Sequence, residues 1–264
     1  TEAGTDTATF YEIADPAVGT TTYDDNEAPA TDYPQNDLSP VTGAYTVPKS
    51  WKYLIAAFNR MFGAGAHESG NQQSRVWYTP AKGTSDKADD ERVPDTTNVK
   101  DWFDLDEGTG GDVTGFAGPI YGSVYVFKYQ GIRSFQPTGG DDPVFDVVDF
   151  STTRGAVDQE AICVGEDAQD RACVYFLDLQ VGPCMVGPVP AQSIGDQGVQ
   201  DSWDDVNLAA TTRVGLVQDY PARGEVWFWW ATGSNNDSNV LAIYTKSTGA
   251  WSINDTGGKI RLAR

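Results

Sequence analysis

Short segments rich in aromatic and β-branched residues recur roughly every 50 residues from Tyr45 to the end of the chain. The clearest instance, 122–135, is two such runs joined by a tight polar turn. The segments 224–231 and 239–252 repeat the pattern and end in a corner of sequence Thr-Gly-Ala-Trp. A unit of this kind cannot bury both faces of its own small sheet, so it needs neighbours of the same kind. The repeat therefore predicts an all-β protein of antiparallel blades, arranged as in a β-propeller.

About four units can be delimited, and their strands follow from period-2 alternation between turn residues. The segments expected to form strands are, unit by unit, 52–58, 59–65, 75–80 and 102–103; then 112–116, 123–128, 131–135 and 144–150; then 159–164, 171–177 and 182–186; and last 211–218, 224–231 and 239–252. An acidic loop at 82–95 interrupts the first unit.

One segment departs from the alternation. Ile194, Val199 and Trp203 recur at roughly helical spacing, so one short helix is predicted from Ser193 to Asp205, although two glycines weaken it. The rest of the chain is expected to be almost free of helix.

The first part of the chain has a different character. Residues 8–14 and 20–23 are predicted to be two short strands, and two strands alone are not a stable unit. We therefore interpret 1–25 as the end of a β-sandwich-like module, 26–48 as a polar, proline-containing linker, and 49–264 as the propeller-like domain.

The charge balance constrains the partners. The 264 residues carry 38 acidic and 18 basic side chains, a net charge of −20. Binding to nucleic acid needs clustered lysine and arginine, which this balance argues against. Two interpretations stay open: a hydrated surface suited to a salty medium, or an acidic passage through which DNA slides without sticking. No apolar run approaches the ~20 residues of a membrane helix, so a soluble protein is expected.

Cysteine usage does not indicate a disulfide scaffold, because there are only three cysteines. Cys163 and Cys173 are equidistant from Ala168, the centre of a polar turn. A symmetric hairpin would place them directly opposite each other on one face, either as reduced thiols or as a cross-strand disulfide. Cys184 falls on the next strand, so the three do not have zinc-site spacing.

No catalytic, cofactor or metal site is predicted. His67 is the only histidine and lies in a glycine-rich polar loop, which excludes histidine-based triads and multi-histidine zinc sites. The segment 108–115 has the glycines of a phosphate-binding loop but lacks the Lys-Ser/Thr ending, so it is interpreted as a hairpin turn. The segment 252–257 fits the Ser-x-Asp-x-Gly box of sialidases poorly.

Other candidate groups have a structural and a functional interpretation. Spacing along the chain cannot show the fixed gap between two carboxylates that a glycosidase needs. The loop 233–239 could supply oxygen ligands to Ca²⁺, but its composition also suits a plain hairpin turn. Trp227 and Trp229 share a face and could stack on sugars or fill the strand core, of which we favour the core. Acidic residues also occur side by side, at Asp24/Asp25, Asp89/Asp90/Glu91, Asp141/Asp142 and Asp204/Asp205. Of these, Asp141/Asp142 is a further candidate for binding Ca²⁺.

Four elements occur in an order that resembles a known family. They are 114–118 leading into 124–128 and 131–133; 153–157 followed by the Cys163/Cys173 hairpin; the helix ending at 202–207; and 239–244 with 249–252. In this order they resemble the propeller region of viral tail proteins, the nozzle, hub or "stabilisation" proteins of short-tailed bacteriophages or archaeal viruses. The similarity spans about 45–255, and 11–25 is similar to the end of the immunoglobulin- or fibronectin-like module often placed before such propellers.

The resemblance implies a structural, non-enzymatic protein of the virion tail, assembled in the host cytoplasm. Its expected partners are further copies in a homo-oligomeric ring and other tail or connector proteins, with DNA passing through during genome ejection without specific binding or membrane insertion. Family members are usually longer, with six or more blades, which leaves a trimmed portion or a reduced version closed by neighbouring subunits, and we favour the former. The alternative function is a propeller that binds or cleaves carbohydrate at a host surface.

Overall fold

The computed structural model describes residues 51–65, 74–79, 81, 102–105, 109–140, 144–187, 189–195, 198–210 and 214–255. These residues form an all-β structure of four separate four-stranded antiparallel sheets, numbered 1 to 4 in chain order. The module predicted at 1–25 and the linker predicted at 26–48 lie outside the described residues.

Each sheet is a meander, because its strands are ordered in space as they are in sequence. Sheet 1 contains β1 (Tyr53–Ala57), β2 (Arg60–Ala64), β3 (Arg75–Tyr78) and β4 (Trp102–Asp104). Sheet 2 contains β5 (Val113–Ile120), β6 (Ser123–Lys128), β7 (Gly131–Pro137) and β8 (Phe145–Ser151). Sheet 3 contains β9 (Ile162–Glu166), β10 (Ala172–Asp178), β11 (Gly182–Val186) and β12 (Gln192–Ser193). Sheet 4 contains β13 (Gly215–Tyr220), β14 (Glu225–Trp230), β15 (Val240–Thr245) and β16 (Ala250–Asp255).

Tight turns join the first two strands of sheets 1 and 2. Phe58 and Asn59 between β1 and β2 have φ of 52° and 56°, and Tyr121 and Gly122 between β5 and β6 have φ of 50° and 79°. Two successive residues with positive φ match the twist of an antiparallel pair, as in type I′ hairpins. The four predicted units are confirmed, because each corresponds to one of the four sheets.

The sheets stack through three hydrophobic cores. Val124 and Val126 of β6 belong to the core between sheets 1 and 2, whereas Tyr125 and Phe127 of the same strand belong to the core between sheets 2 and 3. Period-2 alternation thus makes both faces of a central strand apolar. In β10, Val174 and Phe176 likewise face sheet 2, and Cys173, Tyr175 and Leu177 face sheet 4.

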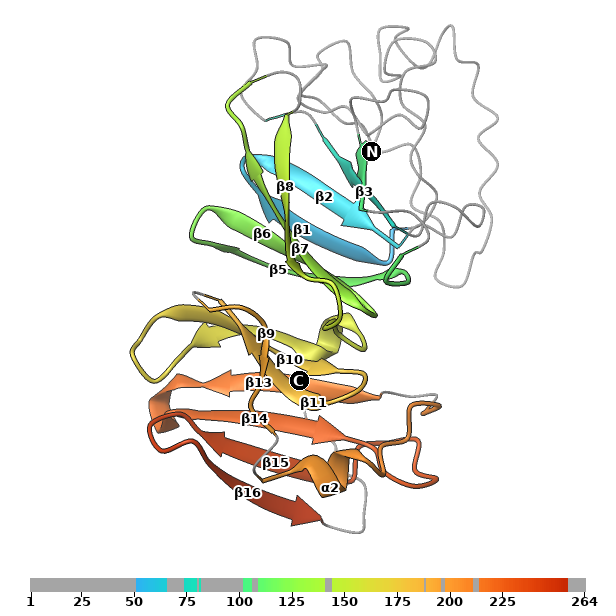
Figure 1. Ribbon diagram of the computed structural model, residues 1–264, viewed down its shortest axis with the longest axis vertical. Coiled ribbons are helices and arrows are strands. Elements are labelled where there is room, and N and C mark those ends of the chain that lie inside the picture. Colours follow the sequence, from blue (N-terminus) through green and yellow to red (C-terminus); the bar gives the residue numbers. More distant parts are fainter. Residues whose placement is uncertain are drawn as a thin grey trace, which may run out of the picture.

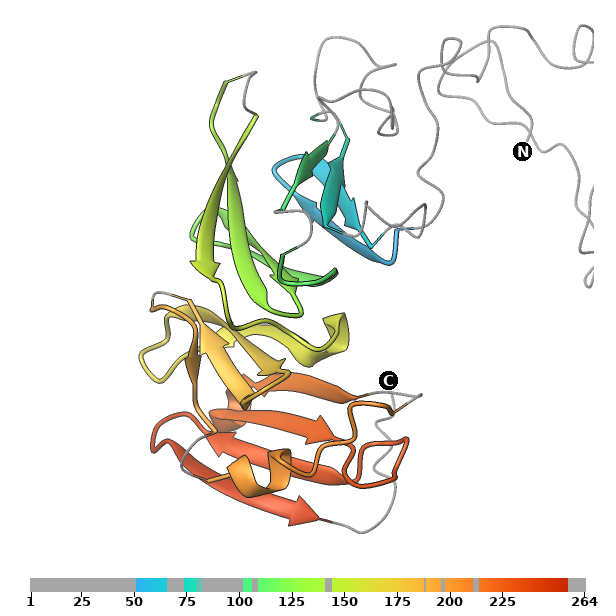
Figure 2. The same cartoon turned by 45° about the vertical axis from the view of Figure 1, so that its right-hand side comes forward.

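The first strands of consecutive sheets contact one another, β1 with β5, β5 with β9, and β9 with β13. The sheets therefore fan out from a shared inner row of strands, with sheet 1 and sheet 4 at opposite ends of the molecule (Figures 1 and 2). Polar contacts tie the row together. The side-chain amide of Gln159, in the short 3-10 turn η1 (Gln159–Ala161), accepts from Phe116 N at 2.7 Å and donates to Phe116 O at 3.0 Å.

The predicted helix at 193–205 is wrong in extent. The helix α2 spans only Gln200–Trp203, and Ser193 belongs to β12, a strand that the sequence did not predict. Ile194 N still donates to Pro183 O at 2.9 Å, which continues the pairing of β11 with β12. Val199 and Trp203 are nevertheless buried in the core between sheets 3 and 4, so the apolar spacing was correctly identified. Within the described residues, no helix is long and apolar enough to cross a membrane.

Gly198 provides a test of this packing. A Cβ built there would lie 2.8–2.9 Å from the first ring atoms and the Cβ of Trp251, too close without a shift of the indole. We expect Gly198→Ala to lower the free energy of unfolding by about 1–3 kcal/mol. The control, Gly140→Ala, meets only Thr138 Oγ1 at 3.6 Å and should leave stability unchanged or raise it by up to ~1 kcal/mol. Urea unfolding of the two variants measures both values, and equal stabilities would contradict the packing.

Candidate functional site

A cavity of about 220 Å³ lies where the β9–β10 hairpin of sheet 3 meets β15 of sheet 4. Its lining is amphipathic, since tyrosine rings and apolar side chains alternate with a carboxylate, a guanidinium and amides. The lining residues are Asp167, Ala168, Gln169, Arg171, Tyr175, Met185, Val189, Gln192 and Tyr244. The polar groups of this lining decide what chemistry is available in the cavity.

The rim of this cavity is a loop held closed by Asp167. Asp167 Oδ1 accepts from Gln169 N at 2.8 Å and from Arg171 N at 3.0 Å, and Oδ2 accepts from Arg171 Nε at 2.8 Å. Burial by itself raises the pKa of the Asp167 carboxyl, but these hydrogen bonds outweigh it and lower the pKa below its ordinary value of 3.8. The carboxylate is therefore ionised and fully occupied within its own loop.

The same loop corrects the predicted cysteine pair. The loop runs from Asp167 to Arg171, so the hairpin is centred on Gln169 and not on Ala168. As a result Cys163 lies opposite Tyr175, and Cys173 lies opposite Gly165. The prediction that the two cysteines are directly opposite is wrong by two residues of register. Cys163, Cys173 and Cys184 are all free thiols.

Behind the cavity lies a buried ion pair within sheet 4, where that sheet contacts sheet 3. Lys246 Nζ is 2.6 Å from Asp219 Oδ1, and the two side chains are 8% and 7% exposed. Asp219 N donates to Cys163 Sγ at 3.2 Å, and Glu166 N donates to Asp219 Oδ2 at 3.4 Å. Losing one partner of such a pair leaves an uncompensated buried charge, at a cost of about 3–5 kcal/mol. Lys246 thus holds the Asp219 carboxylate in place, and the two bonds from Asp219 to β9 fix how sheet 4 sits on sheet 3.

The remaining groups beside the cavity are poor nucleophiles at neutral pH. Burial raises the pKa of the Cys163 thiol and raises the pKa of Cys173 to about 11. Burial also raises the pKa of Tyr175 far above its usual range, and its hydroxyl donates to Glu166 O at 3.0 Å. The arrangement thus offers protonated thiols and a hydrogen-bonded phenol, which suit packing better than covalent catalysis.

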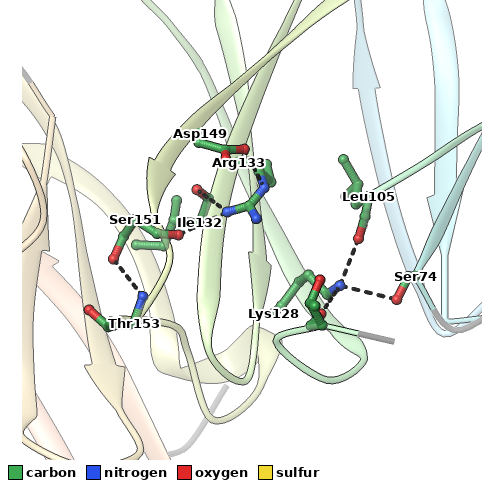
Figure 3. Close-up of polar contacts among 9 residues, drawn as sticks. Ser74, Leu105, Lys128, Ile132, Arg133, Asp149, Ser151 and Thr153 are labelled. Atoms are coloured by element: carbon green, nitrogen blue, oxygen red, sulfur yellow. Dashed lines mark hydrogen bonds and ion pairs between the residues drawn. The ribbon is translucent and has the colours of Figure 1, made fainter. Parts of the chain in front are cut away.

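Basic side chains are similarly committed to structural contacts. Lys128, at the end of β6, is almost fully buried and donates to Ser74 Oγ at 3.1 Å, to Leu105 O at 2.7 Å and to Thr109 O (Figure 3). Arg133 of β7 pairs with Asp149 at 2.6 Å and donates to Ser151 O at 2.9 Å.

In the described part of the chain, every lysine and arginine has such a contact. The other contacts are Lys52–Asp158, Arg60–Thr79 O, Arg75–Asp104, Arg154–Asp178, Arg171–Asp167, Arg223 over the ring of Trp227, and Lys246–Asp219. The basic groups that the structure describes are therefore engaged within the molecule and are not arranged as a phosphate-binding groove.

Several predicted groups can be placed individually. Asp204 Oδ1 accepts from Gln200 Nε2 at 2.7 Å within the first turn of α2. In the loop 233–239, Asn239 Oδ1 accepts from Thr232 N at 2.8 Å and its amide donates to Thr232 Oγ1 at 2.9 Å, which favours the hairpin turn over a Ca²⁺ loop. Among the described residues, no three His, Cys, Asp or Glu side chains cluster as metal ligands. His67, Gly108 and the acidic residues at 24–25, 89–91 and 141–142 lie outside the described residues.

The prediction that Trp227 and Trp229 fill the strand core is confirmed for Trp229, which is 2% exposed, but not for Trp227. Phe228 and Trp230 fill the core against sheet 3, and Trp227 and Trp229 lie on the opposite face. Trp227 is half-buried, stacks on Tyr220 at 4.5 Å between ring centroids, and donates from Nε1 to Glu225 Oε2 at 2.8 Å. Sequence reasoning missed this half-buried aromatic pair, because both faces of the strand are aromatic.

Comparison of the sequence with known proteins identifies no family for this chain. No protein-family model matches this sequence, and no curated protein matches it.

A pH titration tests the role of Asp167. Because its pKa is lower in the folded than in the unfolded state, its contribution to stability is complete above about pH 4 and is lost as the pH falls through the folded-state pKa. Urea unfolding from pH 7 to pH 3 should show wild type more stable than Asp167→Asn at neutral pH, with the difference shrinking below pH 3.8. The control is Asp146→Asn, at an exposed position on β8, which should leave the free energy of unfolding at pH 7 within about 0.5 kcal/mol of wild type.

Alkylation tests the cysteine environment. With a pKa of about 11, on the order of one Cys173 thiol in a thousand is ionised at pH 8, and the side chain is fully buried. We expect iodoacetamide to leave Cys173 and Cys184 unmodified in the folded protein and to modify all three cysteines after denaturation, as read by mass spectrometry. Rapid modification of Cys173 in the folded state would contradict its burial between sheets 3 and 4.

Proposed function

We propose that the protein is a structural component of a viral tail, a nozzle, hub or adaptor that forms part of the conduit for genome ejection. The order of its sequence elements resembles that family, and the proposal treats its sheets as propeller blades. The observation that carries it is the fan of four sequential meanders whose first strands contact one another. Blades of a propeller radiate from a central axis in this way.

The charge distribution supports a conduit. The net charge is −20, and the described lysines and arginines are engaged in internal contacts. An acidic wall repels a passing phosphate backbone over about 8–10 Å at physiological salt. DNA would then move past the protein without the counterion release that makes basic proteins hold it. The mechanism we propose is mechanical and electrostatic, with no catalytic step.

The proposal places the protein in the virion tail, assembled in the host cytoplasm. Its partners are further copies of itself in a ring and neighbouring tail or connector proteins. The alternative is a carbohydrate-binding propeller, which the partly exposed pair of Trp227 and Tyr220 with the Glu225 carboxylate favours. Aromatic rings flanked by a hydrogen-bonding carboxylate can stack on a sugar.

Imaging tests the conduit. We expect antibodies against the chain to decorate the tails of particles purified from the source culture. In a cryo-electron microscopy reconstruction of those tails, aspartate and glutamate should dominate the lumen wall. A lumen lined mainly by lysine and arginine would defeat the conduit mechanism, and absence of the chain from particles would defeat the virion role.

A glycan array with the purified chain separates the two functions. We expect no binding above background, and the matched variant Trp227→Ala should behave as wild type. Binding that Trp227→Ala abolishes would favour the carbohydrate-binding alternative, and hydrolysis of a glycan would overturn the structural class.

A further inference from the structure

Four of the described strands are outer edges, on the side of their sheets away from the inner row: β4, β8, β12 and β16. β4 has three residues and β12 has two, which leaves little backbone for a further strand to pair with. β8 has seven residues and is the longest of the four (Figure 1). An edge strand of this length presents a row of backbone N–H and C=O groups that another strand can use.

The middle of β8 is exposed on both faces of the sheet. Val147 is 38% exposed and Val148 is 45% exposed. Because successive side chains of a strand point to opposite faces, one exposed valine lies on each face. Asp146 and Asp149, which are also exposed, flank the two valines. The edge therefore presents the order acidic, apolar, apolar, acidic, whereas β16 exposes one large apolar side chain among its described residues, Ile253.

The register of β7 with β8 decides which backbone groups face outward. Thr138 N donates to Val144 O at 3.1 Å, one step beyond the first pair of the two strands. Hydrogen-bonded and non-hydrogen-bonded pairs alternate along an antiparallel ladder, so positions 144, 146 and 148 direct their backbone groups to β7. Val147 and Asp149 direct theirs away from β7. No described strand lies on that side of β8.

A second copy of β8 is a poor match for this edge. Outward groups must pair with outward groups, so two antiparallel copies overlap best with position 146, 147 or 148 at the centre. The first of these registers places Asp146 directly opposite Asp146 of the second copy. The other two place Asp146 or Asp149 diagonally opposite the same residue of the second copy. Like charges across a strand pair are destabilising, and the net charge of −20 on each copy adds to the repulsion.

We propose that β8 receives an extended basic segment of a partner protein as an added antiparallel strand of sheet 2. The segment has the order basic, apolar, apolar, basic, so that its apolar side chains lie opposite Val148 and Val147 and its basic ones opposite Asp149 and Asp146. Backbone hydrogen bonds to the outward groups give affinity, and the cross-strand pairs give selectivity. The proposal goes beyond the proposed function, since it does not depend on where the protein works.

The two carboxylates differ in how much they contribute. Asp149 already pairs with Arg133 of β7, with Oδ1 and Nε 2.6 Å apart. Asp146 lies opposite Gln136, an uncharged residue. Asp146 is therefore the main determinant of the partner's charge.

A peptide titration followed by NMR tests this edge in the full chain. The probe is a short blocked peptide with Lys-Val-Val-Lys at its centre, and the matched control has Glu-Val-Val-Glu in the same flanks. We expect the lysine peptide to shift backbone amide signals of β7 and β8, most strongly those of Val147 and Asp149. The lysine peptide should bind about 10-fold more tightly than the glutamate peptide, because two cross-strand charge pairs change sign.

Three variants separate strand addition from simple charge attraction. Val147→Pro removes an outward N–H, which an edge strand tolerates, and should weaken binding of the lysine peptide about 10-fold or more. Val147→Thr keeps that N–H and a β-branched side chain, and should bind as wild type does. Asp146→Lys should reverse the preference, so that the glutamate peptide binds more tightly. Circular dichroism checks that each variant is folded.

Three results would overturn the proposal. They are no shift of the β8 amides at about 1 mM lysine peptide, equal binding by folded Val147→Pro, and an unchanged preference in Asp146→Lys. A wild-type dimer in light scattering that Val147→Pro converts to a monomer would assign the edge to a second copy and would likewise overturn the basic partner.

Discussion

The need of a small antiparallel sheet to bury both faces governs this structure. A four-stranded meander has no covering layer of its own, and side chains alternate between its two faces. Strands β6 and β10 meet this need with apolar residues at nearly every position, which divide between two cores. Each internal sheet therefore requires a neighbour on either side, and the chain can satisfy that requirement only by repeating the same unit.

Hydrophobic contact between flat faces does not by itself fix how one sheet sits on the next, and buried polar groups supply the missing constraint. Lys128 joins sheet 2 to the loops of sheet 1, and the amide of Gln159 pairs with the backbone of Phe116 across sheets 2 and 3. Asp219 of sheet 4, paired with Lys246 in the same sheet, joins sheet 4 to Cys163 and Glu166 of sheet 3. A buried donor or acceptor left without a partner costs about 1–3 kcal/mol, so each contact selects one relative placement of its sheets.

Local alternation was enough to predict the sheets, because it reflects burial on two faces. The segment 123–128 coincides with β6. Five consecutive residues of this strand are buried, because alternate side chains enter two different cores. Features that depend on a contact with another strand or with a particular side chain were not predictable. β12 is two residues long, and it forms because its residues pair with Cys184 and Met185. The register of the cysteine hairpin depends on the side chain of Asp167, and composition of the turn alone placed its centre one residue too early.

The same limit applies to the candidate sites. The sequence showed that Trp227 and Trp229 share a face, but it could not show which face of sheet 4 meets sheet 3, since Phe228 and Trp230 are equally aromatic. On the face away from sheet 3, Trp229 is buried and Trp227 is half-buried. With the described basic groups held in internal contacts and the thiols protonated, the remaining chemical character of the molecule is its acidity, a net charge of −20. A molecule of this charge repels a phosphate backbone at short range, which is the property on which the proposed conduit depends.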